Sequence, residues 1–531
     1  MPFYAKDNCT FPFTNLYQAI RHNHGHSYTA LNNTDGNSAV RSDNLSDLEC
    51  RYEAPVVTQK ELRGWYGYGF ACEPFSVSAL GVFIPIILES LAAEAGYELD
   101  YYTPCDTSAA QYNCVIKIGS VYVGTNSFSL YVRAISVAFQ AFVFIGCGAI
   151  ADHGRWRKTF LLLFAMMGSI SGMLFPIAYK PSLWWLATIL SIITCVCFGA
   201  SFVFYASYIP TLTRYHPNVL EVHSQGDEEE VARVTEKVAN SISSKGMAWG
   251  YFAGVIVLAI SAVIVYVLGQ SNYSMQIACA FTCFWWFIFT YAPYKWLKSR
   301  PGPPLPEGES YLLYSWKKMF NTVSHISQLT QTFRFLLAWF FISDAISTTT
   351  SISILFCKTV LGMGHAELLI AGIIVPLTAG IGNFMWLHIQ RKYRLHTKFM
   401  ITMLVSMYAV LPIYGLLGFV LPFGIRHQAE AWGVCIYIGI LLGAVQSFCR
   451  VMYSELLPPG KESEFFSLYQ ITDKGSAWIG PLICGAVADY TQNLRYAFWP
   501  IVVMLLIPVM VIRSVNVSEG KAQAQRYQMK N

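Results

Sequence analysis

Hydrophobic residues gather in blocks along the chain, and each block is about twenty residues long. A helix of that length crosses roughly 30 Å of hydrocarbon, because each helical residue adds about 1.5 Å. Short polar segments separate twelve such blocks. The pattern therefore predicts an all-α polytopic membrane protein with twelve transmembrane helices. The blocks cover residues 65–91, 127–151, 159–179, 183–207, 247–268, 275–293, 333–357, 366–389, 399–421, 431–453, 465–488 and 496–512.

Composition agrees with a lipid environment. Hydrophobic residues make up 54% of the 531 residues and charged residues 13%, whereas soluble proteins carry about 25% charged residues. The net charge is +5, and no basic stripe with interleaved aromatic residues lies outside the blocks, so no nucleic-acid partner is expected. The first sixty residues are polar and lack the apolar core of a cleavable signal peptide.

Charge in the connections predicts the orientation. With the amino terminus in the cytosol, the cytosolic connections between blocks hold 17 lysines and arginines, and the opposite loops hold five. This bias follows the positive-inside rule. An even number of spans then places both termini in the cytosol. The five on the opposite side are Lys117, Lys180, Lys358, Arg426 and Arg495.

The first non-cytosolic loop contains Cys105 and Cys114. An oxidising lumen lets such a pair form a disulfide, and two free thiols are the alternative. Other cysteine pairs, residues 195 and 197 and residues 279 and 283, lie inside apolar blocks without a His or carboxylate partner. We therefore expect no metal site. Of the glycosylation sequons, only that of Asn272 falls on the glycosylating side.

A long polar connection divides the chain into two six-helix halves. The expected segments are a disordered cytosolic tail over 1–63, the first half over 64–293, a linker over 294–332, the second half over 333–513 and a cytosolic tail over 514–531. The linker begins with a proline-rich stretch. Apolar residues then recur at helical spacing over 311–320, which fits an interfacial amphipathic helix or a solvated loop helix.

The two halves share sequence features at an offset of six helices. Residues 245–250 read KGMAWG, and residues 474–480 read KGSAWIG. Glu73 in the first helix precedes serines at 76 and 78, and Asp344 in the seventh precedes Ser347 and Thr348. A parallel duplication of a six-helix unit produces such an offset.

The loop over 148–158 reads GAIADHGRWRK. It resembles the loop motif of the major facilitator superfamily, although the spacing from Asp152 to Gly154 is one residue shorter than usual. The corresponding loop over 390–394 keeps the bases and lacks the acid. Asp152 can accept hydrogen bonds from a neighbouring helix end, and positive-inside charge alone is the simpler interpretation of the bases.

Several further segments are similar to the autophagy-related protein 22 family, the fungal vacuolar amino-acid effluxers. The resemblance extends over about 62–513. It implies a vacuolar membrane location and the export to the cytosol of amino acids, such as leucine, that autophagic breakdown releases. The segments are 64–68, 73–75, 243–246, 340–344, 455–460 and 478–481.

Among the charged residues of the apolar blocks, four stand out at the depth of the bilayer: Glu73, Arg133, Asp344 and Arg450. Charges at this depth usually face a cavity or a partner, and the facilitator resemblance implies that helices 1, 4, 7 and 10 line a central cavity. An acid among them suits the ammonium of an amino acid, and Arg450 suits its carboxylate. The alternatives are structural bridges between these acids and arginines, and proton coupling.

The gate candidates at the cytosolic mouth are Asp152, Arg155, Lys245, Asp473 and Lys474. No nucleotide-binding loop, nucleophile elbow or cofactor loop is present in the sequence, so we expect neither an enzyme nor a cofactor. The expected partners are free amino acids and the bilayer. A carrier of another solute and a non-transporting scaffold or receptor are the alternative functions.

Overall fold

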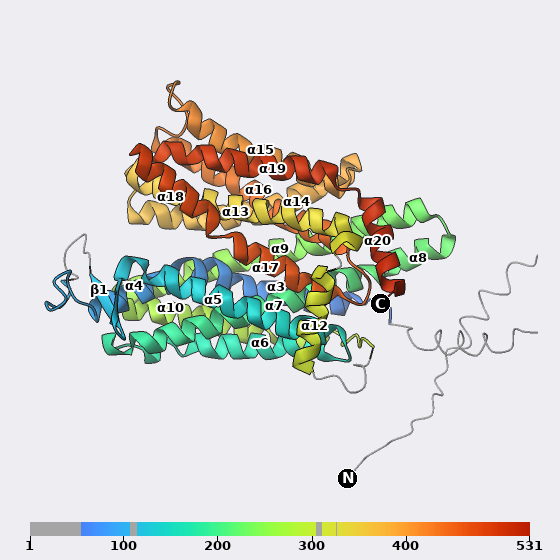
Figure 1. Ribbon diagram of the computed structural model, residues 1–531, viewed down its shortest axis with the longest axis horizontal. Coiled ribbons are helices and arrows are strands. Elements are labelled where there is room, and N and C mark those ends of the chain that lie inside the picture. Colours follow the sequence, from blue (N-terminus) through green and yellow to red (C-terminus); the bar gives the residue numbers. More distant parts are fainter. Residues whose placement is uncertain (1–54, 107–113, 304–310, 325, 531) are drawn as a thin grey trace, which may run out of the picture. The chain divides into compact units, whose positions relative to one another are not determined.

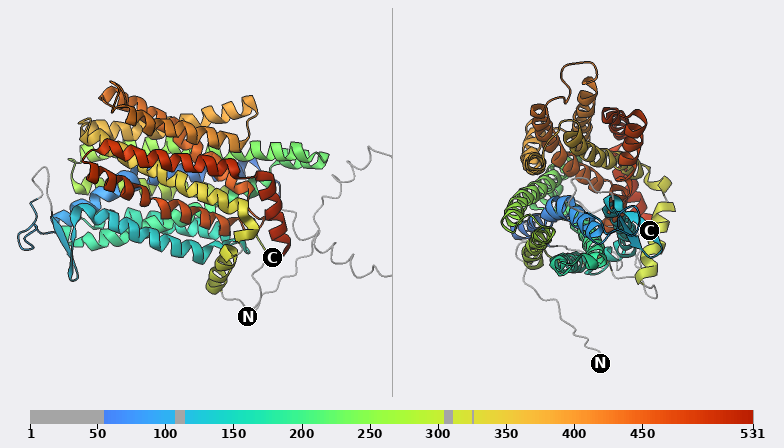
Figure 2. Two further views of the ribbon diagram at one scale, coloured as in Figure 1. Left: turned by 45° about the horizontal axis from the view of Figure 1, so that its top comes forward. Right: turned by 90° about the vertical axis from the view of Figure 1, so that its left-hand side faces the viewer.

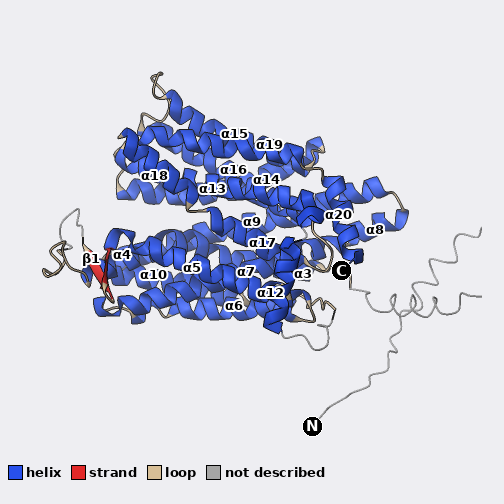
Figure 3. Cartoon of the chain, viewed as in Figure 1, coloured by secondary structure: helices blue, strands red, loops and turns tan. Residues whose placement is uncertain are grey.

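Helices dominate the protein (Figure 1, Figure 3). The computed structural model describes residues 55–106, 114–303, 311–324 and 326–530. The first half comprises α3 (Gln59–Pro74), the π-helix η1 (Phe75–Phe83), α4 (Ile84–Glu94), α5 (Thr125–Gly148), α6 (Trp156–Met173), α7 (Trp184–Arg214), α8 (Pro217–Gln225), α9 (Glu228–Val267), α10 (Asn272–Phe289) and α11 (Tyr291–Trp296). The linker contains α12 (Tyr311–Ser324). The second half comprises α13 (Thr330–Thr359), α14 (His365–Tyr393), α15 (Thr397–Leu417), α16 (Gln428–Glu455), α17 (Glu462–Ser476), α18 (Ile479–Thr491), α19 (Phe498–Ser514) and α20 (Val517–Lys530).

Within the described residues, 11 helical segments are long and apolar enough to cross a membrane. These segments match eleven of the predicted spans, so the polytopic all-α fold is confirmed. The remaining span, predicted over 465–488, is divided into α17 and α18, with the break at residues 477 and 478. Neither piece alone is as long as the 20 or so residues that a span requires.

The first helix starts earlier than predicted. Thr58 caps α3, because its hydroxyl accepts the Glu61 N–H at 3.3 Å. Residues 59–63 are therefore helical and do not belong to the tail; residues 1–54 lie outside the described part. Pro74 ends α3, and its missing N–H leaves the carbonyl of Phe70 without its helical donor. The indole of Trp285 in α10 donates to that carbonyl at 3.1 Å.

A small hairpin follows α4. Strands β1 (Val115–Ile118) and β2 (Val121–Gly124) pair antiparallel, with Val115 opposite Gly124. A disulfide joins Cys105 to Cys114, whose Cα atoms are 5.8 Å apart. Asp100 in this loop accepts hydrogen bonds from the Thr103 hydroxyl and nearby backbone N–H groups, which lower the pKa of its carboxyl. We call this end of the helices the hairpin end.

The opposite end, here called the terminal end, holds α8 and α20 (Figure 1). The helices form two groups, and α9 of the first half packs against α14 and α16 of the second along a seam. The ribbons of the two groups diverge toward the hairpin end, and Figure 2 shows the same two groups from other sides.

The linker and the carboxyl-terminal segment are both docked on the helices. Trp316 of α12 packs on Phe142 of α5 with ring centroids 5.2 Å apart. Arg300 forms a buried bidentate pair with Glu61, both bonds 2.9 Å long. The segment predicted as a tail after residue 513 contains α20, in which Lys521 pairs with Glu455 at 2.8 Å and Tyr527 is 1% exposed.

Candidate functional site

Arg450 lies at the seam between the halves. Its side chain comes from α16 and is buried, with 3% of the residue exposed. One guanidinium nitrogen donates to the sulfur of Met247 in α9, and the guanidinium carbon lies 4.8 Å from the centre of the Phe202 ring in α7. The other terminal nitrogen, Nη1, is buried and has no hydrogen-bond partner among the described residues. Arg450 thus reaches across the seam and still has a nitrogen that can donate a hydrogen bond.

Glu73 lies in electrostatic reach of Arg450. It is buried at the end of α3 and makes no hydrogen bond or ion pair with any described residue. The cations that act on it are Arg450 and Lys474 of the second half. Its stem fits against Gly250 of α9, where an added Cβ would lie 2.4 Å from the Glu73 Cγ. The site therefore contains a buried acid without a partner and a buried base with a free nitrogen.

Asp344 is also buried, but its carboxylate is occupied. Both oxygens accept the Gly480 N–H at 3.1 Å, and the Thr348 hydroxyl lies 3.4 Å from one of them. Gly480 is the second residue of α18, so its N–H has no acceptor within the helix. The break before α18 thus supplies a donor and a helix amino terminus to the carboxylate.

The two acids occupy matching places in the repeated sequence. Glu73 packs on Gly250, the last residue of KGMAWG, and Asp344 packs on Gly480, the last residue of KGSAWIG. The second segment has one residue more, and its helix is broken there. Gly250 lies within the continuous helix α9, where its N–H is used by the helix. This difference explains why only Asp344 receives a backbone donor.

Asp473 and Lys474 lie deeper than predicted. They pair at 2.7 Å, and the Ser343 hydroxyl donates to the Asp473 carboxylate. Asp473 stands eleven residues after the start of α17, which is roughly 17 Å along a helix. Because α17 begins at residue 462, it carries the pair inward to the neighbourhood of Asp344 and Glu73, and a gate role for the pair stays a prediction.

Arg133 is not part of this cluster. It lies on α5 with an exposed side chain and forms no ion pair with a described residue. Within the described part of the chain, no ion pair joins Glu73 or Asp344 to either Arg133 or Arg450. The structural bridge considered from the sequence is therefore not formed in this conformation.

A second charged cluster joins the halves at the terminal end. Arg157 at the start of α6 pairs with Asp152 at 2.7 Å and with Glu462 at 2.9 Å. Arg214, at the end of α7, reaches the other oxygen of Glu462 at 3.4 Å. Asp152 also accepts the backbone N–H groups of residues 463 and 464 at 2.8 and 2.9 Å, so it caps α17. We call these four side chains the terminal lock.

Of the predicted gate residues, only Asp152 belongs to the terminal lock. Arg155 is exposed, and Lys245 is half-buried without an ion pair among the described residues. The sequence reasoning missed Arg157, Arg214 and Glu462 as a group, because they lie in three polar segments far apart in the chain. The signal available was an acid two residues after a Pro-Pro-Gly turn and shortly before a predicted span.

Hydroxyl and amide contacts continue the seam from the terminal lock toward Arg450. Ser244 and Ser447 hydroxyls are 2.9 Å apart, and the Asn240 amide donates to Thr397 at 2.6 Å. Tyr251 donates to Gln446 at 3.2 Å. These contacts use residues 240–251 of α9, which runs to residue 267 at the hairpin end. The hydrogen bonds across the seam therefore extend from the terminal side to the level of the charged site.

Asn272 begins α10, and Ser274 of its sequon is buried; glycosylation there stays a prediction. The described residues contain no group of three metal-ligand side chains.

Comparison with known proteins gives the family. The model for "Vacuole effluxer Atg22 like" proteins matches residues 57–525. Autophagy-related protein 22 of Pyricularia oryzae is 37% identical, over 88% of this chain and 78% of the relative. The protein of the same name from Botryotinia fuckeliana is 35% identical, over 90% and 84%.

Solved structures show the same fold at low identity. The major facilitator superfamily transporter FucP in its outward conformation has a TM-score of 0.57 at 11% identity, covering 87% of this chain and 99% of that one. The human organic anion transporter MFSD10 has a TM-score of 0.56 at 14% identity, covering 86% and 100%. A vacuolar-type membrane transporter is the function consistent with both comparisons. The chain belongs to the family of Atg22-like vacuole effluxers, built on the major facilitator fold.

Proposed function

We propose that this protein exports free amino acids, such as leucine, from the vacuole to the cytosol by alternating access. One observation carries the proposal: a buried base with an unused nitrogen, Arg450, lies in electrostatic reach of a buried acid that has no partner among the described residues, Glu73. An amino acid brings one carboxylate and one ammonium. It would satisfy both groups at once.

The chemistry favours a zwitterion over a solute of single charge. Each buried ion without a partner destabilises the protein, and a zwitterionic solute supplies a partner to both ions. Arg450 can take a carboxylate through a charge-assisted hydrogen bond. Asp344 already accepts the Gly480 N–H, so we assign the ammonium to Glu73 and give Asp344 the task of holding α18 in place.

The loop charges favour a cytosolic terminal end, with both termini on that side. On this assignment, the present conformation is closed toward the cytosol by the terminal lock. Export then requires the lock to separate and the halves to rock about the charged site. The lumenal end carries the hairpin and its disulfide, which suits an oxidising compartment.

The first test is leucine efflux from proteoliposomes that contain the purified protein. Arg450→Ala should reduce efflux by about ten- to a hundredfold, because a charge-assisted contact is worth roughly 1.5–3 kcal/mol and Glu73 would remain buried without a balancing charge. Arg450→Lys should keep part of the activity. Arg133→Ala is the matched control, since this arginine of the apolar region is exposed and should leave efflux near the wild-type rate. Wild-type efflux from the Arg450→Ala protein would remove Arg450 from the site.

Proton coupling is tested in the same vesicles. Efflux is measured with and without an imposed pH gradient. A rate that follows the gradient indicates that a proton accompanies the solute, and an unchanged rate indicates uncoupled export.

A carrier of simple anions is the second candidate, because Arg450 alone would suit a lone carboxylate. The Glu73→Gln variant separates the two. It should lose leucine efflux while the protein remains folded, since the neutral amide no longer balances an ammonium. If both the wild type and Glu73→Gln transport a monocarboxylate such as lactate, the protein is a carrier of simple anions and the amino-acid assignment is wrong.

A further inference from the structure

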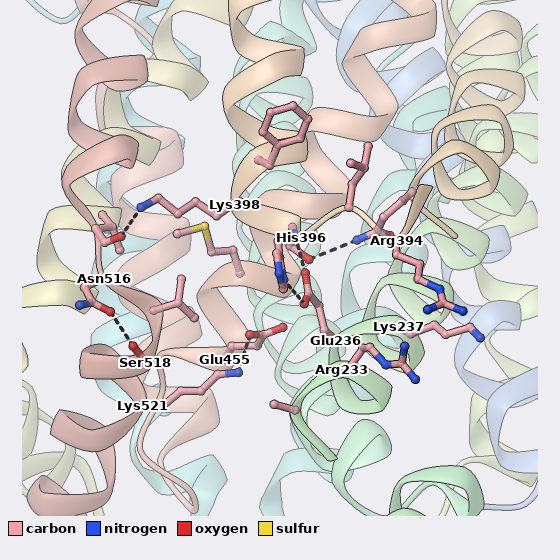
Figure 4. Close-up of a pocket in the computed structure, with 18 of the residues that line it drawn as sticks. Arg233, Glu236, Lys237, Arg394, His396, Lys398, Glu455, Asn516, Ser518 and Lys521 are labelled. Carbon is pink, nitrogen blue, oxygen red and sulfur yellow. Dashed lines mark hydrogen bonds and ion pairs between the residues drawn. The ribbon is translucent and has the colours of Figure 1, made fainter. Parts of the chain in front are cut away.

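An open pocket of about 1210 Å³ lies at the terminal end, apart from the charged site (Figure 4). Its walls come from the start of α9, the end of α14 and start of α15, the end of α16, and the segment joining α19 to α20. The function proposed above makes no use of it.

The pocket is rich in cations. Seven lysines and arginines line it, against four glutamates. Lys237, Arg391 and Arg394 have no ion-pair partner among the described residues. Figure 4 shows the nitrogen ends of Arg233, Lys237 and Arg394 pointing toward the same side of the pocket. These cations repel one another unless an anion enters.

Three of the four glutamates are already engaged. Glu230 pairs with Arg233 at 2.5 Å, and Glu455 pairs with Lys521 at 2.8 Å. Glu236 lies 3.3 Å from His396 and accepts the backbone N–H of Thr397. The fourth, Glu229, forms no ion pair among the described residues, and even with its charge the cations of the pocket outnumber the acids by three. The cavity contains more positive charge than its own residues neutralise.

We propose that this pocket binds a multiply phosphorylated anion. Several cations around one open volume suit several phosphate groups, and arginine matches phosphate in a two-pronged geometry. A single carboxylate would leave most of them unpaired. Basic pockets between membrane helices on the cytosolic side are typical places for inositol phosphate headgroups. The ligand is either the headgroup of a phosphorylated inositol lipid or a soluble inositol polyphosphate, since both present the same chemistry.

Binding here would bear on transport, because the pocket straddles the seam. Lys237 belongs to the first half, whereas Arg391 and Arg394 belong to the second. An anion that contacts both sides holds the halves together at this end. It stabilises the conformation in which the terminal lock is closed, and a ligand that prefers one conformation shifts the population toward it. The ligand is thus expected to slow efflux.

The test measures binding by the full-length protein in nanodiscs, so it does not depend on transport activity. One arm titrates fluorescent inositol hexakisphosphate into nanodiscs of neutral lipid. The other arm titrates a fluorescent phosphatidylinositol bisphosphate into the same nanodiscs. The variants are Lys237→Ala, Arg391→Ala and Arg394→Ala. The matched control is Lys392→Ala, which removes a cation between two of these positions that does not line the pocket.

Each pocket variant should weaken binding about fivefold, as roughly 1 kcal/mol is lost per cation near a phosphate, and the control should bind like the wild type. Saturable binding in the first arm alone identifies a soluble ligand, and saturable binding in the second alone identifies a lipid. Equal weakening by Lys392→Ala would reduce the effect to general surface charge and overturn the proposal. Absence of saturable binding in both arms would also overturn it.

Discussion

Glu73 and Asp344 show how neighbouring atoms decide the role of a buried carboxylate. Both side chains are buried against a glycine of another helix, but only Asp344 finds a donor there. The sequence predicted both acids and Arg450, because a charge inside an apolar block stands out. It could not separate their roles. That distinction depends on one N–H group that is free only because a helix begins beside it.

Substitution of Gly480 tests this contact. A Cβ there would lie 1.9 Å from the Thr348 hydroxyl and 2.9 Å from an Asp344 oxygen. We expect Gly480→Ala to destabilise the protein by about 1–3 kcal/mol through overpacking, seen as a lower melting temperature in detergent. Gly485→Ala is the matched control in the same helix, since an added Cβ there meets nothing within 4 Å. If the melting temperature of Gly485→Ala falls as far as that of Gly480→Ala, the loss of stability is general to α18 and is not due to the contact with Asp344.

Helix ends account for most of what the sequence did not predict at the scale of elements. The hydropathy of residues 465–488 predicted one span, yet the segment forms α17 and α18. Hydropathy measures transfer to lipid and is insensitive to a single break in hydrogen bonding. The amino terminus of α17 was likewise unforeseen as a contact, because its cap, Asp152, comes from a loop 311 residues away from Ser463.

Loss of that cap should loosen α17 locally. Asp152→Ala removes the acceptor of two backbone N–H groups and one partner of Arg157. Breaking a buried ion pair costs roughly 3–5 kcal/mol. We expect much of this destabilisation to fall on the terminal end, where α17 begins. Hydrogen–deuterium exchange should therefore accelerate in peptides that cover residues 460–467. Arg155→Ala, three residues along the same loop and exposed, should leave exchange there unchanged; acceleration by both variants would contradict the capping role.

At the scale of the whole molecule, block length, loop charge and the repeat were enough to predict two bundles of membrane helices. They were insufficient to predict which contacts hold the bundles together, since those contacts pair residues about 200 to 300 positions apart. Small polar side chains along α9 and α16 make much of the seam, and such residues are common in any membrane helix.

Locking the seam should stop transport. The Ser244 and Ser447 hydroxyls are 2.9 Å apart across it, so cysteines at both positions are close enough to form a disulfide. Under oxidising conditions, the doubly substituted protein should lose efflux, and a reductant should restore it. The single variants Ser244→Cys and Ser447→Cys serve as controls and should be insensitive to the oxidant. Efflux by the cross-linked protein would rule out a mechanism in which these surfaces separate.

The added residue in the second copy of the repeated segment has a consequence for how such a protein can diverge. KGMAWG and KGSAWIG differ in length by one residue, and a single codon accounts for it. An insertion inside a helix rotates all later side chains by about 100° around the helix axis. In the second copy, the helix is instead broken at residues 477 and 478. The longer copy anchors its acid, Asp344, on the Gly480 N–H, whereas the shorter copy leaves Glu73 without a donor. Removing Ile479 is the corresponding reverse step, and it would show how much of the functional asymmetry depends on one insertion.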